Sequence, residues 1–506
     1  MGKYIAVTIG PIFDTINLTS SPAALWAASY MFSMLSKNIC ETLTENGVAE
    51  TDIISPKYAS DDPLLNRDDG VGLFHDRIVF RAGSFDIKDF NRVKEAALSK
   101  TVSQFGFEDK DLDFFRHYFL ISAVAYESDN PIADSNLPLD SLELMKPLAF
   151  ERGDDQTEGK NPILSFFTAD GERHKSDRIK IKEQIRKMGI QNWQLYDNNR
   201  NIMSLSEIAA NGIPKELKKQ FKKYQYYALI RSDGDRMSRI VGQLDTAEKI
   251  TAFSQTCLSY CAEIADKVKQ YGGVTIYSGG DDLLALLPVE NGNKETVFDF
   301  IQTANRVFAE KFDQMKKTYA ITDADVSLSF GVFISYYKFP LYEALERSAE
   351  LLFGVAKRYR NCAAIRLQKH AGQSQGLLIF NDSLEQYLRL HKAIVKDKAD
   401  ENGEVILSAM HKLSLFKTMF NAAGSFDELQ NLFDNTFDAD AHQGNDFLKT
   451  TLPQFFDSLR PLSVQDGCHI YPITGNEIET DTIDRTQTAE SVLRIVKFFT
   501  ETGGEA

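Results

Sequence analysis

The chain has 506 residues and a formal net charge of −15 at pH 7. Its composition, with 43% hydrophobic and 25% charged residues, is that of an ordinary globular protein. This length has room for about three or four domains with ample core. The acidic balance argues against a free-standing, nonspecific nucleic-acid binder, because such proteins are normally basic. The N-terminal residues lack a signal-peptide pattern, and no apolar run approaches the length of a membrane-spanning helix.

Five cysteines are scattered along the chain, at Cys40, Cys257, Cys261, Cys362 and Cys468. Two of them are four residues apart in an expected helix, but no second pair is present to complete a zinc site. We interpret all five as buried free thiols in a reducing cytoplasm.

The first 129 residues are expected to form a ferredoxin-like unit with the order β-α-β-β-α-β. Strands are predicted at residues 4–9, 53–54, 73–80 and 117–125, and helices at 23–44 and 86–100. Ser21 is expected to cap the first helix, with Pro22 in its first turn. Residues 130–222 are less regular, with helical pieces near 175–187 and 214–223. We interpret them as a helical connector and, since it has no cysteine, expect no metal there.

From residue 225 the order repeats. A strand ends at Ile230, and a helix 237–271, a hairpin 274–289, a helix 295–319, a strand 326–335, a helix from Pro340 to about Arg360 and a strand 363–367 follow. After a short strand 377–380, helical patterns dominate at 383–395, 405–420, 426–437, 446–459 and 488–499. The predicted class is α+β, with domains at 1–129, 130–222, 223–375 and 376–506.

The tip of the predicted hairpin reads Ser278-Gly279-Gly280-Asp281-Asp282 between two apolar runs. Glycine and aspartate are ordinary turn residues, but two adjacent carboxylates between buried strands are not. The glycines let the backbone twist, so both carboxylates can face one site. Their repulsion favours a hard divalent cation with oxygen ligands between them.

Asp233 and Gly234 follow the β-rich run 226–230, just before the long predicted helix. Carboxylates at a strand end and at a hairpin tip are the arrangement of two-metal sites in polymerase and cyclase palm domains. The alternative is that Asp233 and Asp235 cap the following helix, and Asp235 in particular is expected to do so.

The runs Y-Y-A-L-I-R-S-D-G-D-R-M at 226–237 and Y-S-G-G-D-D-L-L-A-L-L-P at 277–288 resemble the large, polymerase-like subunit of type III CRISPR effector complexes, within its III-B branch. The resemblance implies two palm domains, with the second one catalytic. The first has Gly10-Pro11 where the second has Asp233-Gly234, and it lacks a paired-acid hairpin. The C-terminal helical domain is implied to dock small helical subunits.

The resemblance also implies a nucleotidyl transfer. Asp233, Asp281 and Asp282 would hold two Mg²⁺ or Mn²⁺ ions and carry the catalysis, with ATP as the donor. Nucleotide-binding positions are implied at Gly234, Ser278, Gly279, Gly280, Lys357 and Arg360. The last two lie in Ala356–Asn361, which resembles the family pattern A-K-x-x-G-[KR]-N but is one residue shorter and lacks the glycine. The alternative for Lys357 is a solvated cation at a helix end.

The implied product is an adenylate second messenger, made when the assembled complex binds target RNA. Most relatives make cyclic oligoadenylate, and some III-B relatives join AMP to S-adenosylmethionine. The departures at Ser238-Arg239 and in the shortened A-K motif make the second product a candidate, and both products stay open. The implied partners are the other subunits, and guide and target RNA largely through them, in the cytoplasm and without a membrane. The alternative function is a catalytically idle scaffold and RNA sensor. A diguanylate cyclase fits the hairpin but not two palms with a helical C-terminal domain.

Many members of this family carry an N-terminal HD nuclease domain, and His75-Asp76 is a dipeptide of that kind. Such a site needs further His and Asp ligands on helices, in a domain that precedes the first palm. Because the first palm begins at about residue 4, we interpret the dipeptide as a surface pair and expect no DNase activity.

Overall fold

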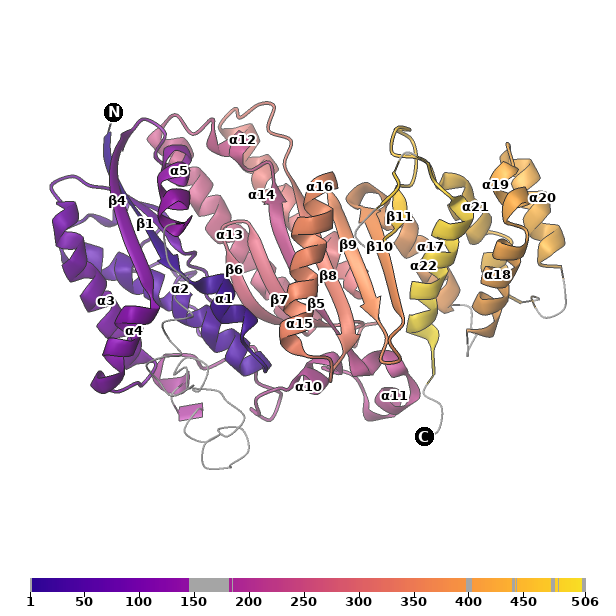
Figure 1. The fold of residues 1–506 in the computed structure, drawn as a ribbon, viewed down its shortest axis with the longest axis horizontal. Helices are drawn as coiled ribbons and strands as arrows, with labels where there is room; N and C mark the ends of the chain where they lie inside the picture. Colours follow the sequence, from indigo (N-terminus) through magenta and orange to yellow (C-terminus); the bar gives the residue numbers. More distant parts are fainter. Residues whose placement is uncertain are drawn as a thin grey trace.

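The computed structural model describes residues 2–144, 182–183, 185–396, 403–438, 442, 444–474, 478–480 and 482–502. Figure 1 shows an elongated molecule, with an N-terminal sheet at one end, a larger central sheet next to it and C-terminal helices at the other end. The predicted α+β class is confirmed. In the part of the chain that the structure describes, no helix has the length and apolar composition needed to cross a bilayer.

The N-terminal sheet has four antiparallel strands in the order β2-β3-β1-β4. The strands are β1 Gly2–Gly10, β2 Ile53–Ser55, β3 Arg77–Arg81 and β4 Leu120–Ser128. The helices are α1 Ile12–Asn17, α2 Pro22–Glu45, α3 Phe90–Gln104, α4 Leu112–Tyr118 and α5 Pro131–Leu144. Side chains alternate across β1, so Ile5 and Val7 join the main core while Ala6 packs with Leu139 of α5. As predicted, α2 begins after Ser21, whose Oγ accepts a hydrogen bond from the Ala24 amide at 3.2 Å.

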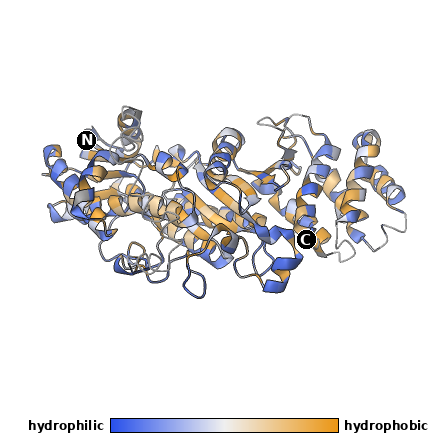
Figure 2. Ribbon diagram, turned by 60° about the horizontal axis from the view of Figure 1, so that its bottom comes forward, coloured by the Kyte–Doolittle hydropathy of each residue, from blue (hydrophilic) through white to orange (hydrophobic). Residues whose placement is uncertain are grey.

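The central sheet has seven strands in the order β11-β10-β9-β8-β5-β7-β6, and only β8 and β9 run parallel. The strands are β5 Tyr226–Asp235, β6 Val274–Gly279, β7 Asp282–Pro288, β8 Ser327–Tyr336, β9 Cys362–Gln368, β10 Ser374–Phe380 and β11 Ile470–Pro472. The helices before and within this unit are α10 Leu205–Ala209, α11 Lys215–Gln220, α12 Ser238–Val241, α13 Ala247–Tyr271, α14 Val297–Thr318, α15 Leu341–Ala349, a π-helical segment Glu350–Ala356 and α16 Lys357–Tyr359. Figure 2 shows its strands as mainly hydrophobic and the outer helices as mixed.

Two helical layers cover the central sheet. Helices α13 and α14 pack against each other, and α13 also packs against the hairpin strands β6 and β7. Helix α15 and the π-helical segment run in front of β5 and β8 in Figure 1. The side chain of Arg231 in β5 faces this second layer, because its Nε donates a hydrogen bond to Ser348 Oγ at 3.0 Å.

The C-terminal helices are α17 Leu384–Lys396, α18 Glu404–Leu415, α19 Lys417–Ala422, α20 Phe426–Thr436, α21 Thr451–Ser458 and α22 Arg485–Thr500. Helix α22 packs against α17, α18, α19 and α21 and also contacts β10 and β11, while α20 packs against α19 and α21. The domain boundary predicted after residue 375 falls inside β10, and β11 belongs to the same sheet although it lies far along the chain. The division into four domains stays a prediction.

The two sheets are joined by helices of the N-terminal unit. Helix α2 packs against β6, which is the edge strand of the central sheet, and α1 contacts α15. The ring of Phe13 in α1 lies 5.6 Å from the guanidinium carbon of Arg231. The space between the sheets is therefore bounded by α1 on one side and by the hairpin and α15 on the other.

Several predicted boundaries were wrong. The helix expected at 237–271 is two helices, α12 and α13, separated around Gly242–Thr246. The strand expected from residue 73 begins at Arg77, and β11 was not predicted because its three residues are too short to show a periodic pattern. The helix predicted at 175–187 lies mostly outside the described residues, as does most of the connector for which no metal was expected.

Gly331 allows the α15 layer to approach the sheet closely. A Cβ at this position in β8 would lie 2.3 Å from the carbonyl oxygen of Ser348 and 2.6 Å from the amide nitrogen of Leu352. Both atoms belong to helical backbone, so they cannot move away as a flexible side chain can. By contrast, a Cβ at Gly354 in the π-helical segment would meet nothing within 4 Å.

We expect Gly331→Ala to lower the free energy of unfolding by about 1–3 kcal/mol, because it overpacks a rigid contact. Gly354→Ala is the matched control and should be neutral or stabilise by up to about 1 kcal/mol. Urea unfolding followed by circular dichroism measures both changes. Equal effects of the two substitutions would contradict the close packing at Gly331.

Candidate active site

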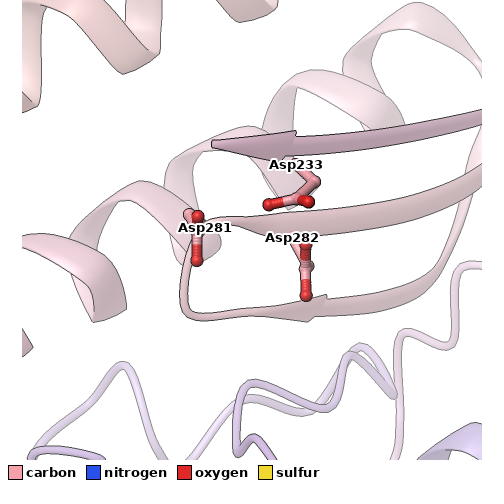
Figure 3. Close-up of side chains that lie close together, drawn as sticks. All are labelled: Asp233, Asp281 and Asp282. Atoms are coloured by element: carbon pink, nitrogen blue, oxygen red, sulfur yellow. The ribbon is translucent and has the colours of Figure 1, made fainter. Parts of the chain in front are cut away.

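Three carboxylates from two separate parts of the chain meet at the end of β5 and the tip of the β6–β7 hairpin. One oxygen each from Asp233, Asp281 and Asp282 lies within 4.8 Å of the other two. Figure 3 shows Asp233 on β5, Asp282 at the start of the neighbouring β7 and Asp281 in the turn. Because Ser232 pairs with Leu283 across the two strands, Asp233 comes opposite Asp282, and cross-strand neighbours point to the same face.

The hairpin turn places the second carboxylate. Gly279 pairs with Asp282, which leaves Gly280 and Asp281 as the two turn residues. Gly280 has a φ of 68°, in the left-handed region that favours glycine, and at the first position of a two-residue turn this is a common hairpin arrangement. The chain therefore reverses at Gly280 and turns Asp281 back toward β5, where its Oδ2 accepts a hydrogen bond from the Gly234 amide at 3.1 Å.

Gly234 is where the hairpin tip and β5 come closest. A Cβ at this position would lie 2.4 Å from Asp281 Oδ2 and 2.8 Å from Met237 Cγ. A side chain here would push the Asp281 carboxylate away from the cluster. Gly234 thus leaves room for the Asp281 carboxylate in the cluster. A direct contact of Gly234 with a nucleotide stays a prediction.

Burial and mutual repulsion disfavour the charged forms of the hairpin acids. Burial, followed by the charge of Asp233, raises the pKa of Asp281 to about 7. Burial, followed by the charges of Asp281 and Asp233, raises the pKa of Asp282 well above its usual range. A bound cation would relieve this repulsion, and carboxylate oxygens are the ligands that Mg²⁺ and Mn²⁺ prefer. The three side chains therefore fit the metal that the sequence predicted.

Lys357 supplies a resident positive charge beside the cluster. Its Nζ lies 3.0 Å from Asp233 Oδ2 and 3.1 Å from Asp235 Oδ1, and it donates to the carbonyl oxygens of Asp233 and Gly234 at 3.0 and 2.8 Å. The alternative of a solvated helix-end cation is therefore wrong. Its predicted contact with a triphosphate stays a prediction, since these four oxygens already surround the ammonium group.

Asp235 has a different role from the one predicted. Because β5 continues through Asp235 and the next helix begins at Ser238, this residue does not cap a helix. Its carboxylate is buried and accepts hydrogen bonds from the hydroxyls of Ser327 and Ser329 and from the Asn361 amide. Together with Lys357, it joins β5, β8 and the end of α16. The alternation of Asp233 and Asp235 within a strand was the signal that could have revealed this.

The structure also locates Arg360 and Ser278, two other residues that were predicted to bind the nucleotide. Arg360 is exposed and has a φ of 65° and a ψ of 164°, a conformation that glycine normally occupies. The chain therefore adopts a glycine-like backbone at Arg360, within the segment that resembles the family pattern. Ser278 is buried, and its hydroxyl donates to the Cys261 carbonyl at 3.1 Å, on the α13 side of the hairpin. Nucleotide contacts by either residue stay predictions.

Two cavities adjoin the cluster, with volumes of about 470 and 360 Å³. Asp76, Tyr277 and Asp282 line both of them. The larger cavity extends along β5 to Arg231 and is bounded by α1 and the π-helical segment. The smaller one extends over Gly279, Gly280 and Asp281 toward α13. Both volumes are in the range of small-molecule sites.

The prediction that His75-Asp76 is a surface pair was wrong. Both residues lie between the two sheets and line the smaller cavity. Burial, followed by the charge of Arg77, lowers the pKa of His75 to about 4, and its Nε2 is 3.2 Å from Ser55 Oγ. Sequence reasoning missed this because the position of the pair depends on how the two sheets face each other. As predicted, all five cysteines are free and buried.

Comparisons with known proteins agree with this architecture. A model of the second palm domain of Cas10/Cmr2 matches residues 226–365, and a model of the N-terminal part of the CRISPR-associated protein Cmr2 matches residues 4–105. The Cmr2 subunit of the CRISPR Cmr system of Pyrococcus furiosus is 27% identical over 175 residues, which are 29% of this chain and 19% of that protein. The Cmr2 subunit of Saccharolobus solfataricus is 32% identical over 98 residues, 17% of this chain and 9% of that protein. The aligned stretches thus span less than a fifth of these relatives.

Solved structures show the same fold at low sequence identity. A chain of the type III-B Cmr-beta complex in its apo state aligns with a TM-score of 0.60 and 13% identity, covering 99% of this chain and 82% of that one. A chain of the Csm1–Csm4 cassette in complex with cA4 aligns with a TM-score of 0.50 and 13% identity, covering 89% and 69%. The two family models thus assign residues 4–105 and 226–365 to the Cas10/Cmr2 family, and the solved structures share the fold of the whole chain.

Proposed function

We propose that this chain is the nucleotidyltransferase subunit of a type III-B CRISPR complex. It would use ATP, after the complex binds target RNA, to make an adenylate second messenger for antiviral defence in the cytoplasm. The observation that carries the proposal is the convergence of Asp233, Asp281 and Asp282 beside two cavities. A docking subunit without catalysis has no need of three carboxylates whose charges disfavour one another.

The three carboxylates are proposed to hold two divalent ions. Such ions, when bound, lower the pKa of an attacking hydroxyl and neutralise charge on a triphosphate. The chain itself positions these carboxylates: the Gly234 amide donates a hydrogen bond to Asp281, and Lys357 forms an ion pair with Asp233. A contact of Lys357 with the triphosphate would replace one of its present oxygen contacts.

The two cavities suggest how donor and acceptor are arranged. The donor triphosphate is proposed to lie in the smaller cavity, where Gly279 and Gly280 let a phosphate approach the backbone. The acceptor is then proposed to lie in the larger cavity, so that donor and acceptor meet at Asp282, which lines both cavities. The acceptor hydroxyl oxygen forms a bond to the α-phosphorus as the bond to the bridging oxygen breaks, pyrophosphate leaves and the hydroxyl proton passes to solvent. ATP and S-adenosylmethionine are the two candidate acceptors.

The test uses the assembled complex with guide RNA, target RNA, ATP and Mn²⁺. Pyrophosphate release is expected, and mass spectrometry of the product with and without S-adenosylmethionine identifies the acceptor. Absence of pyrophosphate with either acceptor would leave the alternative, a scaffold and RNA sensor with an idle palm.

We expect the double change Asp281→Asn and Asp282→Asn to reduce pyrophosphate release at least a hundredfold, because two of the three ligands lose their charge. Assembly of the complex should be unchanged. The matched control is Asp323→Asn with Asp325→Asn, which removes two exposed acids from the loop before β8 and should keep normal activity. Retained activity in the hairpin variant would exclude this site as the catalytic centre.

The pH dependence of stability without metal provides a second check. The folded-state pKa of Asp281 is about 7, above the ordinary value of 3.8, so between these two pH values the folded protein holds one more proton than the unfolded chain. Stability should therefore fall as the pH rises from about 4 to 7, by a few kcal/mol at most.

In buffer that contains a metal chelator, the variant with Asp281→Asn and Asp282→Asn should unfold at a higher temperature than the wild type at pH 8. The difference between the two unfolding temperatures should be smaller at pH 5. Mn²⁺ should raise the unfolding temperature of the wild type but not of the variant, because only the wild type binds the ion tightly. A wild type that does not respond to Mn²⁺ at pH 8 would argue against a metal site.

A further inference from the structure

The lining of the larger cavity includes a partly buried guanidinium group that the proposed chemistry does not use. Arg231 lies in β5 two residues before Asp233, so both side chains are on the same face of the sheet. Its partner across the strands, Leu284, also lines the cavity, as does Asp282 at the other end. A ligand that fills the cavity therefore extends from the carboxylate cluster to Arg231.

The hydrogen-bonding capacity of Arg231 is only partly used. Its Nε donates to Ser348 Oγ at 3.0 Å, while its Nη2 is buried and has no hydrogen-bond partner among the described residues. A buried, incompletely paired cation costs free energy, so a purely structural role would favour a neutral side chain here.

Two aromatic rings line the same cavity. Phe13 of α1 is 50% exposed and Phe353 of the π-helical segment is 55% exposed, although both are large hydrophobic side chains. The Phe13 ring already lies 5.6 Å from the guanidinium carbon. Exposed aromatic rings in a cavity are suited to stacking against a flat heterocycle.

Among the described residues that line this cavity, Arg231 is the only cationic one, whereas Asp14, Asp76, Glu143 and Asp282 are acidic. Within this described lining, an anionic group therefore finds an opposite charge at the guanidinium. Its planar fork matches carboxylate and phosphate oxygens.

We propose that Arg231 determines acceptor specificity: it holds a single anionic oxygen group of the acceptor, a carboxylate or a phosphate. The flat ring of the acceptor stacks on Phe13 and Phe353. This inference rests on the proposed nucleotidyl transfer and assigns the larger cavity to the acceptor. The residue contacts the acceptor but forms and breaks no bond.

The test measures binding to the assembled complex in chelator with three ligands that share an adenine ring. AMP carries a phosphate, S-adenosylmethionine carries a carboxylate, and adenosine carries neither. Arg231→Gln should weaken binding of AMP or of S-adenosylmethionine at least tenfold and leave adenosine within about twofold. The ligand that is weakened identifies the anionic group. Equal weakening of all three, or of none, would overturn the proposal.

Two further variants separate recognition from folding. Arg231→Lys keeps the charge but loses the fork, so it should restore part of the lost affinity. Phe353→Leu, at an exposed position, should weaken all three ligands alike and provides a test of the site even if Arg231→Gln does not fold. The matched control is Arg347→Gln, which removes an exposed arginine from α15, where it is paired with Glu350, and should change nothing.

Steady-state rates of pyrophosphate release complete the test. Arg231→Gln should raise the KM of the acceptor at least tenfold and change kcat less than threefold, since it binds the acceptor without taking part in the chemistry. An unchanged KM would contradict the proposal. If the wild type releases no pyrophosphate at all, the proposed transfer fails, whereas the binding comparison still decides the role of Arg231.

Discussion

The mutual repulsion of three carboxylates is the constraint on which the rest of this structure depends. Asp233, Asp281 and Asp282 have oxygens within 4.8 Å of one another, and burial adds to the cost of their charges. Such a cluster persists only because the surrounding fold is stable enough to hold it. The antiparallel pairing of β5 with β7 and the turn at Gly280 provide that support.

A second set of contacts places a positive charge next to these carboxylates. Lys357 bridges Asp233 and Asp235, and Asp235 is in turn bound by two serines of β8 and by the Asn361 amide. These contacts tie the end of α16 to the strand that carries Asp233. The unusual backbone of Arg360 lies beside this junction, where the chain must turn sharply to enter β9. Arg360 is thus held in a backbone conformation that glycine normally adopts.

The N-terminal unit contributes to the site, although among the described residues the carboxylate cluster comes from the central sheet alone. It places α1 and the His75-Asp76 pair against the hairpin, so that both cavities have walls from two sheets. Neither cavity would exist on the central sheet alone. This explains physically how a unit with Gly10-Pro11 in place of Asp233-Gly234 can still matter for the proposed reaction: it closes the space in which two substrates are proposed to meet.

The sequence by itself determined the α+β class, most helices and strands, and the group of acids at the cluster. These features depend on local patterns: apolar periodicity, a serine before a proline at a helix start, and a glycine pair before two aspartates. The tertiary structure alone decided the short strand β11, the break between α12 and α13, the buried position of Asp235, the place of His75 in the smaller cavity, and the placement of Arg231 in one cavity with Phe13 and Phe353. Each of these depends on contacts between segments that are distant in the chain, and no local pattern records which side chains meet when two sheets pack.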